Sequence, residues 1–145
     1  MIKAEIKTTI SFDSDVFTNL IVSAIEGGSN YWYFLPEESV NKINDVVSEI
    51  LQQNPTKDLD GLRRPLSVKL ARALMHTNDI AIGINDVESP ETRLGFISNS
   101  SCRNALKIMH NEYCDDYLDA INGNDDAVTA DIFFQLCVFG EVIYC

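Results

Sequence analysis

The feature that most constrains the fold is the apolar stretch "DDAVTADIFFQLCVFG", residues 125–140. At 3.6 residues per turn, its large apolar side chains surround the helix axis on nearly all sides, and a helix of this kind is buried. We therefore expect a central helix over about residues 126–139 that ends at Gly140. The apolar residues that carry this prediction are Val128, Ile132, Phe133, Phe134, Leu136, Val138 and Phe139.

Two polar residues in this helix need an explanation. Asp131 and Gln135 are four residues apart, so their side chains share one face of the helix. Burying an ionised carboxylate is costly unless it is paired or hydrogen-bonded. Two interpretations are open: Asp131 bonds backbone N–H groups or caps a neighbouring element, or it lies in a polar cleft with residues from elsewhere in the chain.

Hydrophobic periodicity in the rest of the chain predicts an α+β fold, with about five helices packed on a small antiparallel sheet. The sheet is expected to contain an N-terminal strand over residues 2–12 and a hairpin near residues 79–97. No linker or repeat divides residues 1–145, so we expect a single domain. The helices are expected near 14–26, 37–53, 67–76, 98–121 with a break near Cys114, and 126–139, and "EVIYC" at 141–145 is expected to form a short final strand.

The stretch "EGGSNYWYF", residues 26–34, is the best candidate for a binding segment. Gly27 stands where a helix would end on a left-handed residue, and two adjacent glycines allow another backbone to approach closely. The aromatic residues that follow offer flat apolar faces with polar groups at their edges. In an extended chain Tyr31 and Tyr33 would point one way, Trp32 and Phe34 the other, so at least one pair is expected in the core.

These observations lead to a cleft hypothesis. Glu26, Asn30 and Asp131, together with Glu141, would share a cleft in which two carboxylates support acid–base chemistry or hold a divalent cation. Alternatively, the polar side chains form a solvated helix face and the aromatic ones only pack the core. The candidate ligand-binding residues are Glu26, Ser29, Asn30, Tyr31, Trp32, Asp131 and Gln135, and no residue is assigned a catalytic role.

Charge and motif content restrict the function classes. The net charge is -11 and no Lys or Arg follows Lys107, which disfavours direct binding to nucleic acid. No apolar run is long enough for a membrane helix, and no signal-peptide pattern begins the chain. His110 and Cys114 have the spacing of half a zinc site, but the chain offers no matching second pair. We therefore expect a cytoplasmic protein with reduced cysteines and with neither metal nor cofactor.

Two stretches, "AIEGGSNYWY" at 24–33 and "NGNDDAVTADIFFQLCVFGEVIY" at 122–144, carry a resemblance to a known family. Paired in this order in a short acidic chain, they resemble a family of small acidic uncharacterised proteins of tailed phages and prophages. The resemblance implies an accessory phage gene expressed inside a bacterial host cell. It supplies no activity, so no catalytic residue is carried over.

Three function classes remain open at this point. The first is a non-catalytic binding protein that meets a basic host protein surface and blocks a host defence factor. The second is a small-molecule binder, such as a nucleotide sequesterer, with an aromatic pocket near Arg63, Arg64 or Arg72. The third is a small enzyme that uses Glu26 and Asp131. The apolar C-terminal segment is also a candidate edge for pairing with a second copy of the chain.

Overall fold

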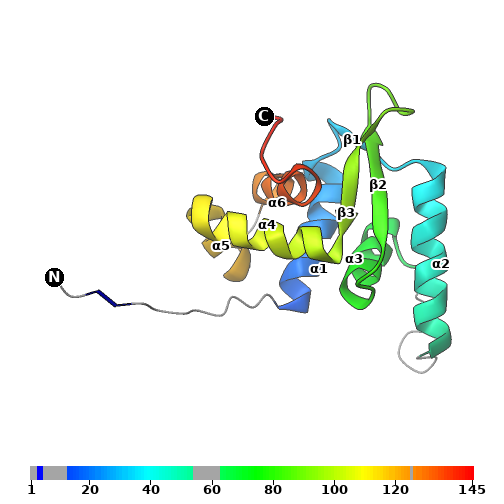
Figure 1. Cartoon of the computed structure of the whole chain (residues 1–145), viewed down its shortest axis with the longest axis horizontal. Coiled ribbons are helices and arrows are strands. Elements are labelled where there is room, and N and C mark those ends of the chain that lie inside the picture. Colours follow the sequence, from blue (N-terminus) through cyan, green and yellow to red (C-terminus); the bar gives the residue numbers. More distant parts are fainter. Residues whose placement is uncertain (1–2, 5–12, 54–62, 125) are drawn as a thin grey trace.

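The computed structural model describes residues 3–4, 13–53, 63–124 and 126–145, and these residues form an α+β fold (Figure 1). Six α-helices pack on a small three-stranded antiparallel sheet in the described residues. None of the helices in this part of the chain is long and apolar enough to cross a bilayer. The elements are α1 (Ser14–Ser23), the π-helical turn η1 (Ala24–Gly28), β1 (Tyr33–Phe34), α2 (Glu37–Gln53), α3 (Leu66–His76), β2 (Ala81–Asp86), β3 (Arg93–Ser98), α4 (Asn99–Glu112), α5 (Cys114–Ile121) and α6 (Ala127–Phe139).

The sheet has the strand order β1-β2-β3, and the hairpin predicted near residues 79–97 is the pair β2–β3. A register shift between Ile84 and Asn85 marks a β-bulge in that hairpin. The third strand is β1, the short segment Tyr33–Phe34, which pairs with the end of β2. The strand predicted over residues 2–12 lies outside the described residues, except for Lys3 and Ala4, which belong to no regular element.

One expectation about the later elements is confirmed and one is wrong. The helical region predicted over residues 98–121 is interrupted near Cys114 as expected: α4 and α5 meet at Tyr113, which has a non-helical backbone conformation. The expected strand at 141–145 is not formed, because this segment makes its backbone hydrogen bonds with a side chain of α6, as described below.

Helix α6 contacts α1, η1, β3, α4 and α5 (Figure 1). The Asp126 side chain caps its first turn by accepting a hydrogen bond from the Thr129 N–H at 2.9 Å. At the other end, Gly140 has a φ of 73°, the left-handed conformation that closes a helix with least strain for glycine. Val128 is an exception among the apolar residues of α6, because its side chain is 65% exposed in the first turn.

Of the two roles that the sequence suggested for the glycine pair after α1, the left-handed helix end is wrong and the close approach of another backbone is confirmed at Gly28. The helix does not end on a left-handed Gly27: it continues as the π-turn η1 and ends at Ser29. Among the described residues, only Gly123 and Gly140 have a positive φ. A Cβ atom at Gly28 would lie 2.5 Å from the carbonyl oxygen of Ala127, whereas one at Gly27 would meet nothing within 4 Å. Gly28 therefore allows the backbone of η1 to lie directly against the start of α6.

Gly28→Ala should lower the free energy of unfolding by about 1–3 kcal/mol, because a backbone atom cannot move aside as a flexible side chain can. Gly27→Ala is the matched control, since its added methyl group has open space and alanine favours a helical conformation. Denaturant titration of the two variants measures the difference. Equal stability of the two variants would contradict the close approach of η1 and α6.

Candidate functional site

The carboxylate of Asp131 in α6 is almost fully buried and accepts four side-chain hydrogen bonds. Its Oδ1 atom accepts from the Ser29 hydroxyl at 2.6 Å and from the Trp32 indole N–H at 2.8 Å. Its Oδ2 atom accepts from the Tyr31 hydroxyl at 2.5 Å and from the Gln135 amide at 3.0 Å. Four acceptor sites are about the full capacity of a carboxylate, so this one has no free position for a further donor.

The Gln135 carboxamide ties the C-terminal segment to α6. Its Oε1 atom accepts the backbone N–H groups of Ile143 and Tyr144, each at 2.8 Å. Its Nε2 atom donates to the Tyr144 carbonyl oxygen at 3.1 Å as well as to Asp131. One buried side chain thus bonds three backbone groups of Ile143 and Tyr144 that a neighbouring strand could otherwise have bonded.

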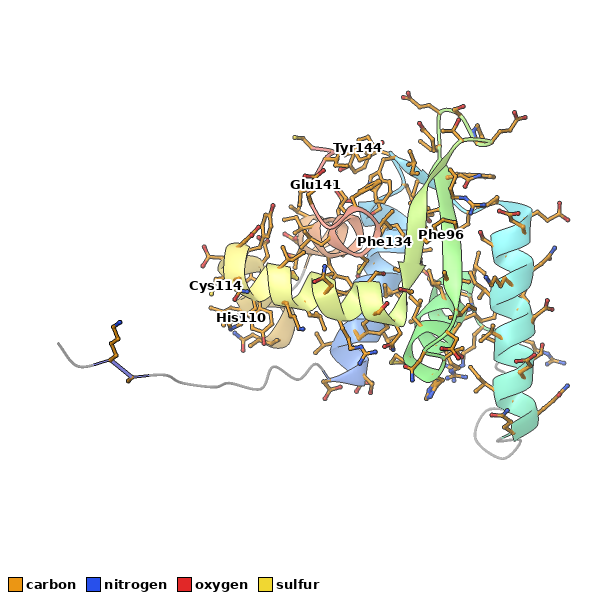
Figure 2. All side chains as sticks on the ribbon, in the orientation of Figure 1. Phe96, His110, Cys114, Phe134, Glu141 and Tyr144 are labelled. Atoms are coloured by element: carbon orange, nitrogen blue, oxygen red, sulfur yellow. The ribbon has the colours of Figure 1, made fainter. Side chains whose placement is uncertain are left out.

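Aromatic packing completes this attachment. The Trp32 ring is buried and stacks on Tyr144, with centroids 5.4 Å apart and an interplanar angle of 10°. Phe134 and Phe139 of α6 lie against the same indole ring, at 5.3 Å and 5.2 Å. Figure 2 shows Tyr144 and Glu141 in the C-terminal chain that follows α6. The C-terminal segment is therefore held by both hydrogen bonds and ring contacts.

The alternation expected for the aromatic run is wrong. The Trp32 and Tyr33 N–H groups both donate to the Ser29 carbonyl oxygen, at 3.1 Å and 3.3 Å, so residues 29–32 form a turn instead of an extended strand. As a result, the adjacent rings of Trp32 and Tyr33 both face the core. The Tyr31 side chain is 46% exposed and that of Phe34 is 40% exposed.

The hydroxyl groups of two tyrosines are held in the protonated form. Burial, followed by the hydrogen bond to Asp131, raises the pKa of Tyr31 to about 12. Burial, followed by the charge of Glu26, raises the pKa of Tyr33 to about 12. The Tyr33 hydroxyl donates to the Ile25 carbonyl oxygen. Both tyrosines therefore serve as hydrogen-bond donors at neutral pH, and neither is prepared to act as a base.

A cavity of about 400 Å³ lies beside this network, between the start of α6, the Gly27–Tyr31 turn and the C-terminal segment. We call it the α6 hollow. Asp131 and Gln135 supply its polar base, and most of its wall is apolar. The residues that line it are Gly27, Gly28, Tyr31, Ala127, Val128, Asp131, Ile132, Gln135, Val142, Tyr144 and Cys145.

The structure brings together only part of the candidate set. Ser29, Tyr31, Trp32 and Gln135 all bond to Asp131, so the two segments that the sequence singled out do meet. Glu26, by contrast, is exposed and accepts a hydrogen bond from Ser67 of α3 at 2.8 Å. Asn30 and Glu141 are also exposed, and none of these three residues lines the α6 hollow.

This placement decides what chemistry the hollow can support. Asp131 is the one Asp or Glu residue among those that line the cavity in the described part of the chain, so Glu26 and Asp131 do not form a carboxylate pair there. The lining residues include no Lys or Arg to face a phosphate group. Within the described ranges, no three His, Cys, Asp or Glu residues are grouped so as to hold a metal ion.

The candidate segment and residues from the sequence omitted six residues that line the hollow: Ala127, Val128, Ile132, Val142, Tyr144 and Cys145. For Val142 and Tyr144 the sequence signal was the mismatch between the polar Gln135 and its otherwise apolar helix, because a buried carboxamide needs hydrogen-bond partners from another segment. Comparison of the chain with protein-family models, with curated proteins and with solved structures returned no match.

Asp131→Asn should lower the free energy of unfolding by about 2–4 kcal/mol. An asparagine offers one acceptor oxygen, and its amide group would face donors that it cannot satisfy. Asp119→Asn, on the exposed surface of α5, is the control and should change stability by less than about 0.5 kcal/mol. Chemical denaturation measures both variants, and an equally small effect at Asp131 would show that the network contributes little to stability.

Proposed function

We propose that this chain is a small acidic accessory protein of a tailed phage or prophage that acts in the bacterial cytoplasm as a non-catalytic binding protein. Its target would be a host protein, such as a defence factor, that it blocks by occupying a surface. The phage setting rests on the resemblance of residues 24–33 and 122–144 to that family. The binding role rests on the α6 hollow.

The observation that carries the binding role is the combination of an open apolar cavity with a polar base whose hydrogen bonds are already made. The acceptor positions of Asp131 are filled by four donors of the same chain. A general base needs a free position from which to take a substrate proton, and a catalytic carboxylate pair needs a second member. The exposed side chains of Tyr31 and Val128 instead offer apolar surface at the rim, where a partner could bury it.

A second candidate is a small-molecule binder, and the size of the hollow favours it. A volume of about 400 Å³ falls within the range of small-molecule pockets, and the lining has the usual mixture of apolar walls and a few polar groups. The ligand would be apolar or aromatic, since no cationic side chain lines the hollow to receive the phosphates of a nucleotide.

Native mass spectrometry of the protein purified from bacterial cells tests this second candidate. A small-molecule binder should carry an added mass that disappears on denaturation and that is reduced in a Val128→Trp variant, in which the larger ring reaches into the hollow. The binding-protein proposal expects the mass of the chain alone. A retained mass that Val128→Trp displaces would therefore favour the second candidate over the first.

Val128→Asp should abolish binding of protein segments to the α6 hollow, because it places a hydrated charge on an apolar wall. The fold should tolerate the change, since the side chain is 65% exposed and an acidic residue in the first turn of a helix is favoured by the helix dipole. The measurement is a selection of displayed short random peptides on the immobilised protein. Peptides that bind the wild-type protein should fail to bind the variant.

The matched control is Val87→Asp, which makes the same substitution at another exposed valine, in the turn between β2 and β3. This variant should retain the selected peptides. If Val128→Asp and Val87→Asp retained them equally, or if no peptide were enriched on the wild-type protein, the hollow would not be a protein-binding surface.

A further inference from the structure

The lining of the α6 hollow and the charges near it indicate the chemistry of a protein partner. We propose that the hollow takes one apolar side chain from a short basic segment, whose Lys or Arg residues flank that side chain and face the carboxylates around the rim. This inference rests on the proposed function, because it names the kind of segment that the binding site would recognise.

The anchoring side chain is apolar because the polar base of the hollow is saturated. Asp131 already accepts four hydrogen bonds. Gln135 uses its oxygen for two backbone N–H groups and its nitrogen for Asp131 and the Tyr144 carbonyl. A Lys or Arg side chain in the hollow would have to break one of these bonds to make its own. An apolar side chain gains contacts with Ile132 and Val142 and breaks none.

The flanking residues are basic because acidic residues stand at the start of α6 and at the start of the C-terminal segment, and both of these segments line the hollow. Asp126 directly precedes Ala127 of the lining, and Glu141 directly precedes Val142. Asp116 of α5 accepts a hydrogen bond from the Thr129 hydroxyl, at 3.3 Å, in the first turn of α6. The Thr129 backbone N–H holds the pKa of Asp126 below its usual value, so this rim carboxylate is charged at neutral pH. No Lys or Arg follows Lys107, so neither α5, α6 nor the C-terminal segment itself carries a cation beside these charges.

The same charges argue against the other occupants of such a surface. A second copy of this chain would bring another net charge of -11 to the interface, and like charges oppose association. A basic segment is attracted from a distance and then held by the apolar anchor. At many protein interfaces, complementary charges speed association and a buried side chain supplies most of the binding free energy.

Three libraries of displayed peptides test the proposal. Each has one central position restricted to apolar residues, and the flanking positions are restricted to Lys and Arg, to Ser and Asn, or to Asp and Glu. The basic-flanked library should be enriched about tenfold over the neutral one on the wild-type protein, with the acidic one lowest, since several exposed ion pairs each contribute modestly. Added salt should reduce the difference in enrichment between the basic-flanked and neutral libraries, because it screens the ion pairs. Val128→Asp should remove the enrichment even though it adds a negative charge.

A pair of double variants separates the rim from the overall charge. Asp126→Asn with Glu141→Gln neutralises two rim carboxylates, and asparagine can still cap α6. Asp45→Asn with Glu49→Gln removes two exposed charges from α2, which packs against β2 and α3, away from the lining of the hollow. Only the first double variant should reduce the preference for basic flanks. If both double variants lost the preference for basic flanks equally, Asp126 and Glu141 would not be the carboxylates that the basic residues face.

The remaining outcomes distinguish this inference from the function on which it rests. If the neutral library is enriched as strongly as the basic one and Val128→Asp abolishes both, the basic partner is wrong and the binding function stands. If none of the three libraries depends on Val128, both proposals fail. Sedimentation of the protein alone tests whether a second copy of the chain fills the hollow. A dimer that dissociates in the Val128→Asp variant would show that it does, and would overturn the basic-segment proposal.

Discussion

The carboxylate of Asp131 is the point at which three separate segments of the chain are joined. It accepts hydrogen bonds from the turn at Ser29–Trp32, and through Gln135 it is linked to the backbone of the C-terminal segment. A buried carboxylate tolerates its loss of hydration only when donors replace the water. Here three of the four donors, Ser29, Tyr31 and Trp32, are 102, 100 and 99 residues away in sequence. The requirement to satisfy one acidic side chain therefore organises the turn, the C-terminal segment and the cavity between them.

This arrangement also supports the proposal of a binding role over a catalytic one. A network in which every polar group has a partner is rigid, and rigidity limits the entropy that is lost when a partner is ordered on it. The same satisfaction leaves the base of the hollow with no free acceptor for a substrate proton. What the hollow presents to solvent is the wall of Val128, Ile132 and Val142 and the half-exposed ring of Tyr31.

The sequence allowed several elements to be predicted for clear physical reasons. Apolar residues with a period of 3.6 identified α1, α2 and α3, an apolar run that ends at a glycine identified α6, and the short connection between β2 and β3 indicated a hairpin. For the site, the polar residues Asp131 and Gln135 on an apolar helix indicated a buried polar cluster, and Ser29, Tyr31 and Trp32 were among the expected members. Glu26 was expected there because it directly precedes the glycine pair and the aromatic run, but in the structure it accepts a hydrogen bond from Ser67 of α3.

The sequence by itself determined which residues are costly to bury unpaired, because hydrophobicity and hydrogen-bonding capacity belong to each side chain. The sequence could not determine which groups would hydrogen-bond to these residues in the folded chain. The turn at Ser29, the close approach of Gly28 to Ala127 and the docking of Tyr144 on Trp32 depend on contacts between distant segments. Only the tertiary structure decided that Asp131 accepts hydrogen bonds from Tyr31 and Trp32 while Glu26 accepts one from Ser67. All of these side chains can donate a hydrogen bond, and the packing of distant segments selects which donor meets which carboxylate.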